Sequence, residues 1–132
     1  MRIAYICADA GVPIFGRKGC SVHVQEIIRA LLAHGARIEI FATRLGGDPP
    51  ADLTAVRVHR LPKLHKTAAA ARELAALSAN QALRAMLVRR GPFDSIYERY
   101  SLWSFAGMDY ARSTGATGIL EVNAPLIEEQ RQ

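Results

Sequence analysis

A continuous apolar run at residues 3–8 constrains the fold of this chain more than any other feature of its sequence. Such a run is typical of a strand that is buried on both faces, and strands of this kind lie centrally in parallel sheets. Residues 20–34 follow with an apolar face at helical spacing, and Gly35 suits the left-handed position that ends a helix. The opening of the chain therefore predicts a strand–loop–helix unit of an α/β domain.

Strand and helix patterns alternate along the rest of the chain. Alternating or apolar runs predict further strands, and longer segments rich in helix formers predict helices. We expect strands at 37–43, 55–61, 95–99 and 117–122, helices at 67–90 and 102–113, and the first turns of another helix at 125–132. This order predicts an α/β domain with an open, mostly parallel, doubly wound sheet, in which ligands bind beyond the carboxyl ends of the strands.

Composition narrows the class of protein. Half of the 132 residues are hydrophobic and 22% are charged, as in ordinary globular domains, and no apolar run approaches the ~20 residues of a membrane helix. The net charge of +5 favours anionic partners, namely a phosphorylated ligand, a lipid surface or a nucleic acid. Cys7 and Cys20 fit neither a metal-binding nor a redox spacing, so we expect a reduced, cytoplasmic protein.

The loop at residues 9–19 is the candidate site of chemistry. It is longer than the ~2–6 residues usual between a strand and a helix in such folds, whereas the GxGxxG, P-loop and GxSxG motifs are absent from the sequence. Gly16 and Gly19 would let a ligand approach the backbone, and we expect Ser21 to cap the following helix, whose first amides favour phosphate. A surface loop with solvated charges is the alternative that the pattern leaves open.

Parts of the sequence resemble a known family. Residues 1–35, which include the segment GRKGCSVHV at 16–24, resemble the start of the retaining family-four glycosyltransferases, and 97–102 (YERYSL) and 120–129 (LEVNAPLIEE) resemble one branch of that family. The resemblance implies a Rossmann-like sheet that forms the N-terminal half of a GT-B architecture, in which two such domains face each other. Residues 48–90 match only in a generic way.

The resemblance implies an activity of the hexosyltransferase type, as in carbohydrate biosynthesis: transfer of a sugar from a nucleotide-diphosphate donor to an acceptor with retained anomeric configuration. Residues 1–132 would form the N-terminal, acceptor-side domain, incomplete at its C-terminal end. The family's C-terminal domain, which supplies most of the donor site, lies outside these residues, so we expect the chain alone to be inactive. No metal or other cofactor is expected, and the sequence identifies neither the donor nucleotide nor the acceptor.

Individual residues carry over from the resemblance as well. Gly16, Lys18 and Gly19 would bind the donor diphosphate, although Lys18 stands where many relatives have a second glycine. Asn123 stands where many relatives have a histidine close to the reacting sugar. An amide donates and accepts hydrogen bonds but takes up no proton near neutral pH, so we expect Asn123 to position a substrate rather than to act as a base.

His23, Arg99 and Glu121 are the residues that the resemblance places along the acceptor cleft. The alternative for Arg99 is an ion pair with Glu98 or Glu121 that ties loops together. Because Glu121 lies in a strand that should be buried, we favour its interpretation as a structural partner of Arg99.

Several other features of the sequence can be explained without a functional role, as surface or core residues. The basic stretch 57–66 would meet an acidic lipid surface or a phosphorylated acceptor, as a peripheral membrane contact, or would simply be solvated. Nucleic-acid binding is disfavoured because a single tryptophan and scattered aromatics form no stacking surface. We expect Trp103 and Phe105 to open the helix at 102–113 and to pack in the core or against another domain, and His59 to lie on the surface.

A second function stays open beside the glycosyltransferase. A non-catalytic α/β module that binds a phosphate or a nucleotide would need the same glycine-containing loop and the same helix start. The two hypotheses differ in whether a second sugar-donor domain accompanies this one.

Overall fold

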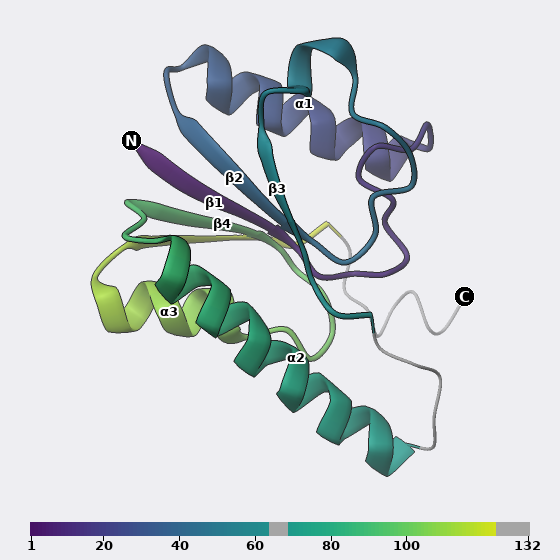
Figure 1. The fold of residues 1–132 in the computed structure, drawn as a ribbon, viewed down its shortest axis with the longest axis vertical. Helices are drawn as coiled ribbons and strands as arrows, with labels where there is room; N and C mark the ends of the chain where they lie inside the picture. Colours follow the sequence, from purple (N-terminus) through teal and green to yellow (C-terminus); the bar gives the residue numbers. More distant parts are fainter. Residues whose placement is uncertain (64–68, 124–132) are drawn as a thin grey trace.

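The computed structural model describes residues 1–63 and 69–123 and shows one sheet between helices (Figure 1). The strands are β1 (Arg2–Cys7), β2 (Arg37–Ala42), β3 (Arg57–Arg60), β4 (Ser95–Arg99) and β5 (Thr117–Glu121). Their order is β3-β2-β1-β4-β5, and every pairing is parallel. The doubly wound, Rossmann-like sheet expected from the sequence is confirmed.

The topological switch point of the sheet lies between β1 and β4. From β1 the chain adds β2 and β3 on one side, and then returns to add β4 and β5 on the other. Open α/β sheets leave a crevice beyond the carboxyl ends of the two strands where this reversal occurs. A ligand site is therefore expected next to Cys7 and Arg99, the last residues of β1 and β4.

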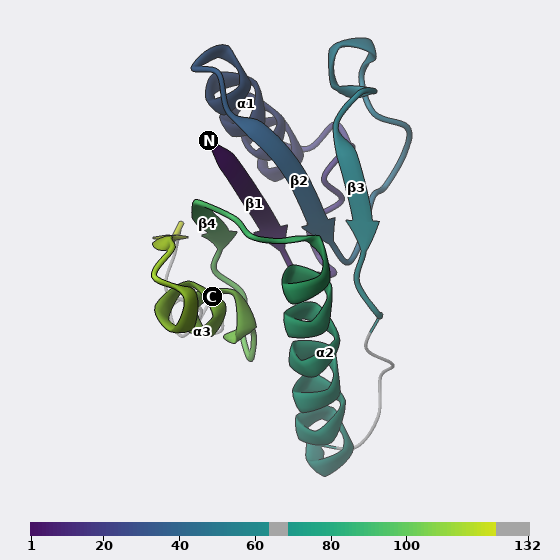
Figure 2. The ribbon, with the colours of Figure 1, turned by 60° about the vertical axis from the view of Figure 1, so that its left-hand side comes forward.

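Helices cover both faces of the sheet (Figures 1 and 2). Helix α1 (Gly19–Ala33) lies on one face, and α2 (Ala69–Arg90) and α3 (Ala106–Thr114) lie on the other. Alternate residues of β1 enter the two cores: Tyr5 packs in the cluster that includes α1 residues, and Ile6 packs in the cluster with α2 and α3. Because both faces of β1 are buried, its sequence is apolar throughout.

The β5 side of the sheet is the less covered part of the described structure. Helix α3 packs on β4 and β5, whereas the strand that α1 contacts most is β2. Ile119, which is 44% exposed, shows that little covers the α1 side of β5 within residues 1–63 and 69–123. The α1 side of β5 is consequently more exposed than the centre of the sheet.

The third helix begins four residues later than the sequence predicts, at Ala106 rather than at 102. Its start is fixed from another helix, because the Asn80 side-chain oxygen accepts hydrogen bonds of 2.9 Å from the amides of Phe105 and Ala106. Trp103 and Phe105 consequently precede the helix, and both are exposed rather than packed in the core of this domain. Of the two expected places, the core of this domain is thus wrong, and packing against another domain stays a prediction.

His59 is not a surface residue, contrary to the expectation from the sequence. Its ring stacks on Phe41 with centroids 4.8 Å apart, and its Nε2 lies 2.7 Å from Glu39 Oε1. Glu39 also accepts hydrogen bonds from Arg2 and Arg90. Burial raises the pKa of Glu39, but these three bonds outweigh burial and lower the pKa to about 2.

Other expectations hold within small shifts of boundary. Gly35 and Gly115 adopt the left-handed conformation after α1 and α3, with φ of 86° and 76°. Strand β3 is shorter than 55–61 and follows a short 3-10 helix, Ala51–Leu53. Both cysteines are free. Within the parts of the chain that the structure describes, no helix has the length and apolar character needed to cross a bilayer. The helix expected at 125–132 lies outside the described residues.

Candidate functional site

A cluster of polar side chains lies at the carboxyl ends of β4 and β5, on the sheet face that α1 occupies. Tyr97 and Arg99 alternate along β4 and therefore share this face, and parallel pairing sets Arg99 opposite Glu121 of β5. His23 reaches the same point from the first turns of α1, and Asn123 follows β5. We call these five residues the Glu121 network, because every contact in it passes through that carboxylate.

Glu121 accepts hydrogen bonds on both of its carboxylate oxygens. Its Oε1 accepts from the Tyr97 hydroxyl at 2.7 Å and lies 3.0 Å from His23 Nε2. Its Oε2 accepts from Asn123 Nδ2 at 2.9 Å and from Arg99 Nη1 at 3.3 Å. Four residues from three different parts of the chain are thus held in one arrangement.

The ionised state of Glu121 follows from these contacts. Burial raises the pKa of Glu121, but hydrogen bonds from Tyr97, Asn123 and His23 outweigh it, so that the pKa lies below its usual range. An ionised carboxylate has about four acceptor positions, and the network fills them. Both oxygens of Glu121 are therefore engaged with neighbouring side chains, an arrangement that suits a carboxylate that orients its neighbours.

The network settles how Arg99 and Glu121 relate to each other. The ion pair between them favours the structural interpretation of Glu121, and Arg99 pairs with it rather than with Glu98. The side chains of Arg99 and Glu121 are 13% and 14% exposed, whereas that of His23 is 47% exposed. Of these three, His23 is the side chain that presents most of its surface to a ligand.

Asn123 is anchored at one end of its amide. Because its Nδ2 donates to Glu121, the amide oxygen is the group left to accept a hydrogen bond from a ligand hydroxyl. Such an oxygen orients a hydroxyl without removing its proton. The geometry is compatible with the positioning role expected for Asn123.

The start of α1 differs in detail from the prediction. The helix begins at Gly19 with Lys18 as its N-cap, and no side chain caps it. Ser21 lies inside the helix, is fully buried, and donates its hydroxyl hydrogen to the Pro13 carbonyl. The expected Ser21 cap is wrong because the helix starts before Ser21 rather than after it. The first amides of α1 are consequently left without a capping side chain.

The two glycines of the first loop have different surroundings. A Cβ atom on Gly16 would lie 3.0 Å from both Pro13 Cγ and Ser21 Oγ, so that the space beside Gly16 is taken by the loop itself. A Cβ atom on Gly19 would meet nothing within 4 Å. Only Gly19, next to the exposed Lys18, leaves room for a ligand to approach the backbone.

The loop is attached to the rest of the fold at residues 14–16. The Gln25 side chain of α1 donates to the carbonyls of Ile14 and Gly16 at 2.9 and 3.1 Å. The amides of Ile14 and Phe15 donate to the carbonyls of Arg44 and Leu45 in the loop after β2. These bonds fix residues 14–16, and the Lys18–Gly19 turn that follows is exposed.

Sequence reasoning missed two tyrosines of this region. Tyr97 belongs to the Glu121 network, and burial, followed by its bond to Glu121, raises its pKa to about 12. Tyr5 of β1 stacks on it with ring centroids 5.4 Å apart, and the buried Tyr5 hydroxyl has no partner in the described structure. The period-two spacing of Tyr97 and Arg99 in a predicted strand is the signal that would have placed Tyr97 in the site.

Glu98 was also missed, and it lies on the opposite face of the sheet. It is completely buried, its Oε2 accepts a hydrogen bond of 2.7 Å from Ser104 Oγ, and its Oε1 has no partner among the described residues. Burial raises the pKa of Glu98 to about 7, and the bond from Ser104 offsets only part of this effect. Nothing in the local sequence distinguishes it from a solvated Glu.

Comparison with family models gives one match. Residues 18–126 match the model of the glycosyl transferase 4-like domain, which is most of the chain. No curated protein is significantly similar in sequence. The matched range contains every residue of the Glu121 network and both Lys18 and Gly19.

Solved structures of glycosyltransferases share the fold. Sucrose-phosphate synthase from Thermosynechococcus elongatus aligns with a TM-score of 0.66 at 16% identity, covering 99% of this chain and 35% of that one. MurG from Acinetobacter baumannii aligns with a TM-score of 0.61 at 12% identity, covering 98% of this chain and 38% of that one. A UGT transferase from Siraitia grosvenorii, solved in complex with UDP, aligns with a TM-score of 0.59 at 12% identity, covering 92% of this chain and 27% of that one. The chain thus spans about a third of the length of these enzymes.

A domain outside that group is equally similar in fold. The C-terminal domain of a hydrogenase from Pyrococcus furiosus aligns with a TM-score of 0.60 at 14% identity, covering 92% of this chain and 91% of that domain. At such identities structural likeness shows the fold alone.

Proposed function

The chain belongs to the glycosyl transferase 4-like domain family, and from this premise we propose that it is the N-terminal, acceptor-side domain of a retaining glycosyltransferase that takes its sugar from a nucleotide-diphosphate donor. The observation that carries the proposal is the Glu121 network beside the uncapped start of α1. It joins the three segments that resemble the family at the crevice where α/β sheets bind ligands.

The donor diphosphate is assigned to the turn at Lys18 and Gly19. Free amides at the start of α1 and the positive end of its dipole attract an anion, and the exposed Lys18 ammonium adds charge. Gly19 leaves the space that a phosphate needs. Gly16 does not contact the donor in this proposal, and instead supports the turn through its packing on Pro13 and Ser21.

The network would serve the transfer step by orientation. Negative charge develops on the leaving diphosphate in the transition state, and fixed donors stabilise it there. His23 and Asn123, both held by Glu121, lie on the acceptor side of that turn and would hydrogen-bond sugar or acceptor hydroxyls. The proposal needs no metal, and it routes no proton through Glu121, whose acceptor positions are filled.

Titration with UDP and GDP, followed by two-dimensional NMR, tests this assignment. We expect weak, saturable shifts centred on residues 18–23, and a loss of about three- to ten-fold in affinity in Lys18→Ala, as for one cation beside a phosphate at a helix start. Gly19→Leu fills the open space and should abolish binding while the fold persists. Arg89→Ala, which removes an exposed charge at the far end of α2, is the matched control.

The same titration addresses the alternative function. A phosphate- or nucleotide-binding module without catalysis would bind UDP equally well, and domains of this fold also occur outside the glycosyltransferases. The two differ when this domain is joined to a donor-binding C-terminal domain: the glycosyltransferase then transfers sugar, and His23→Ala or Asn123→Ala lowers the rate. A module of the second kind shows nucleotide binding and no transfer.

A further inference from the structure

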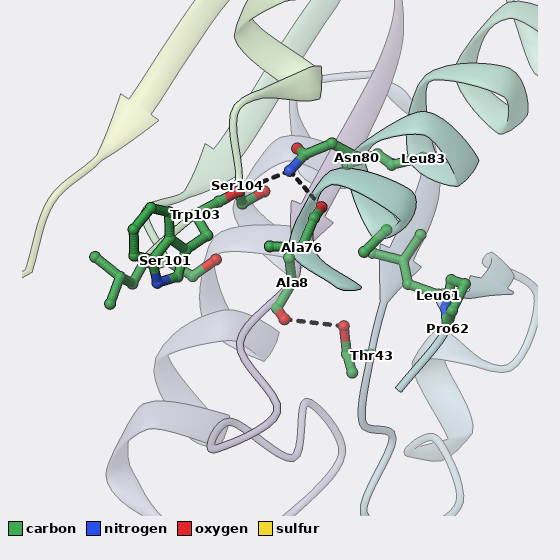
Figure 3. A pocket seen from close by; sticks show the side chains of 12 residues that line it. Ala8, Thr43, Leu61, Pro62, Ala76, Asn80, Leu83, Ser101, Trp103 and Ser104 are labelled. Carbon is green, nitrogen blue, oxygen red and sulfur yellow. Dashed lines mark hydrogen bonds between the residues drawn. The ribbon is translucent and has the colours of Figure 1, made fainter. Parts of the chain in front are cut away.

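A small pocket opens at the same edge of the sheet, on the face that α2 and α3 cover (Figure 3). Its volume is about 50 Å³, which admits a few heavy atoms rather than a whole substrate. The wall is mostly apolar and is formed by residues at strand ends, by the middle of α2 and by the loop between β4 and α3. Ser101, which follows β4, lies in this wall, so that the pocket and the Glu121 network both adjoin the carboxyl end of β4.

Two polar side chains of the wall are satisfied within the protein. Thr43 donates its hydroxyl hydrogen to the Ala8 carbonyl at 2.9 Å, and Asn80 donates to the carbonyls of Ala76 and Trp103 at 2.8 and 2.7 Å (Figure 3). None of the described residues in the wall carries a charge. A charged group placed here would lose its hydration with no opposite charge to replace it.

Ser101 is the exception among the polar groups of the wall. Its side chain is buried, and its hydroxyl has no hydrogen-bond partner in the described structure. A buried, unpartnered hydroxyl destabilises a fold, whereas alanine at this position would leave nothing unsatisfied. A hydroxyl that contributes nothing to the fold, in the wall of a pocket, indicates a ligand that pairs with it.

Trp103 stands at this pocket in a strained backbone conformation. Its φ is 69°, a left-handed value that is unfavourable for a bulky residue. The Asn80 side chain holds the strained turn. It donates a hydrogen bond to the Trp103 carbonyl, and its oxygen accepts hydrogen bonds from the amides of Phe105 and Ala106. Trp103 is thereby kept 55% exposed instead of packing in the core. Strain that the surroundings enforce is typical of binding sites.

We propose that this pocket binds the uncharged, alcohol-bearing end of the acceptor. One hydroxyl on a short carbon segment enters the cavity and hydrogen-bonds to Ser101, and the apolar part next to it lies against the Trp103 indole. The inference rests on the proposed function, which it deepens by naming the chemical class of the acceptor. Phosphate and carboxylate groups are excluded from the pocket, whereas the Lys18–Gly19 turn accepts them.

Benzyl alcohol is a suitable probe, because its hydroxymethyl group fits the cavity and its ring matches the indole. Trp103 is the single tryptophan of the chain, so that intrinsic fluorescence reports on this pocket alone. We expect a saturable change with benzyl alcohol, and binding at least ten-fold weaker with benzoate, which has the same ring and a charge. Equal binding of benzoate would overturn the proposal, and so would the absence of a saturable change with benzyl alcohol.

Variants separate the hydroxyl from the shape of the pocket. Ser101→Ala should lower the affinity for benzyl alcohol about five-fold, the equivalent of one neutral hydrogen bond, without lowering the melting temperature. Ser78→Ala, the same change at an exposed position of α2, should leave binding unchanged. Ala79→Leu, which fills the cavity from α2, should abolish binding in a protein with an unchanged circular dichroism spectrum. Equal affinities of Ser101→Ala and Ser78→Ala for benzyl alcohol contradict the proposal.

The failure of this proposal can be told from that of the glycosyltransferase assignment. UDP titrated into the same sample probes the Lys18–Gly19 turn, which is on the other face of the sheet. Loss of the benzyl alcohol response with retained, Lys18-dependent UDP binding refutes the pocket alone. A benzyl alcohol response together with UDP binding that ignores Lys18→Ala refutes the donor assignment instead.

Discussion

His23 Nε2 lies 3.0 Å from Glu121 Oε1, which joins the first turns of α1 to the end of β5 across 98 positions of sequence. The contact exists because parallel strands bring their carboxyl ends, and the helix that follows the first strand, to one edge of the sheet. Through Glu121 it also includes Tyr97 and Arg99 of β4. One carboxylate therefore holds together three elements that form the candidate site.

Glu121→Ala is expected to lower the free energy of unfolding by about 2–4 kcal/mol. The substitution leaves the mostly buried Arg99 guanidinium and the Tyr97 hydroxyl without their acceptor, and uncompensated buried polar groups are costly. Urea denaturation monitored by circular dichroism measures the difference. Asp109→Ala is the control, because Asp109 forms an exposed pair with Arg112 at 3.9 Å and should change stability by less than about 0.5 kcal/mol. Similar losses in the two variants would show that the network is no more than a surface contact.

Stability should fall as the pH rises from about 4.5 to 7, on account of Glu98. Its pKa is raised from 4.5 to about 7 in the folded protein by burial, so that the folded state holds a proton that the unfolded state has released. The stabilising contribution is complete below pH 4.5 and is lost as the pH passes 7, with a total of up to about 3 kcal/mol. Denaturation at a series of pH values measures this slope.

Glu98→Gln separates Glu98 from the other titrating groups. The amide cannot ionise, so that the variant should be more stable than the wild type at pH 8, and its profile between pH 5 and 7 should be flatter. Glu26→Gln, on the exposed side of α1, is the matched control and should reproduce the wild-type slope. A slope in Glu98→Gln equal to that of the wild type would show that Glu98 is ionised in the fold throughout this range.

The sequence predicted the sheet well because its strands are marked by local patterns. The apolar run at 3–8 placed β1 at the centre, and Gly35 and Gly115 marked two helix ends that the structure confirms. The start of α3 escaped prediction because its cap comes from Asn80, 26 positions from Ala106. A cap that is supplied by another helix leaves no trace in the local sequence.

The candidate site was predictable in part from the resemblance to a known family. His23, Arg99, Glu121 and Asn123 were all expected at the cleft, and the structure brings them together. The network's fifth member, Tyr97, was not expected there, although its period-two spacing from Arg99 places both on one face of β4; which residue of β5 they meet depends on the register of the two strands. Register is a property of the folded sheet rather than of any one segment.

Gly16→Ala and Gly19→Ala should have opposite effects on stability. A methyl group on Gly16 must displace Pro13 or Ser21 from a distance of 3.0 Å, and overpacking of this kind costs about 1–3 kcal/mol. A methyl group on Gly19 meets no atom and replaces glycine in a helix, which stabilises by up to about 1 kcal/mol. Thermal unfolding of the two variants measures both effects. A comparable loss in both would mean that the turn at Gly19 is as crowded as that at Gly16.

Asn80→Ala should release the turn that holds Trp103. Four hydrogen bonds of the Asn80 side chain are lost, and the amides of Phe105 and Ala106 lose their acceptor. We expect a destabilisation of about 2–4 kcal/mol and a shift of the tryptophan emission, as the indole leaves its strained position. Asn80→Asp keeps the oxygen that accepts from both amides, so that it should recover much of the stability. It lacks the NH₂ group that donates to the Trp103 carbonyl, so that the tryptophan emission should stay shifted. Emission that is unchanged in Asn80→Ala would show that Asn80 does not hold the indole.

The chain alone should not transfer sugar from UDP or GDP donors, although it should bind the nucleotides weakly. A leaving diphosphate needs several fixed donors and cations in the transition state, and the first loop supplies the start of α1 and Lys18. The glycosyltransferases of the same fold are about three times as long as this chain, which is the ground for assigning the remaining donor contacts to a further domain. Release of UDP or GDP from their sugars, in the presence of alcohol acceptors, is the measurement. Transfer by the 132 residues alone, abolished in Asn123→Ala, would instead place the complete donor site within this domain and overturn the division of roles.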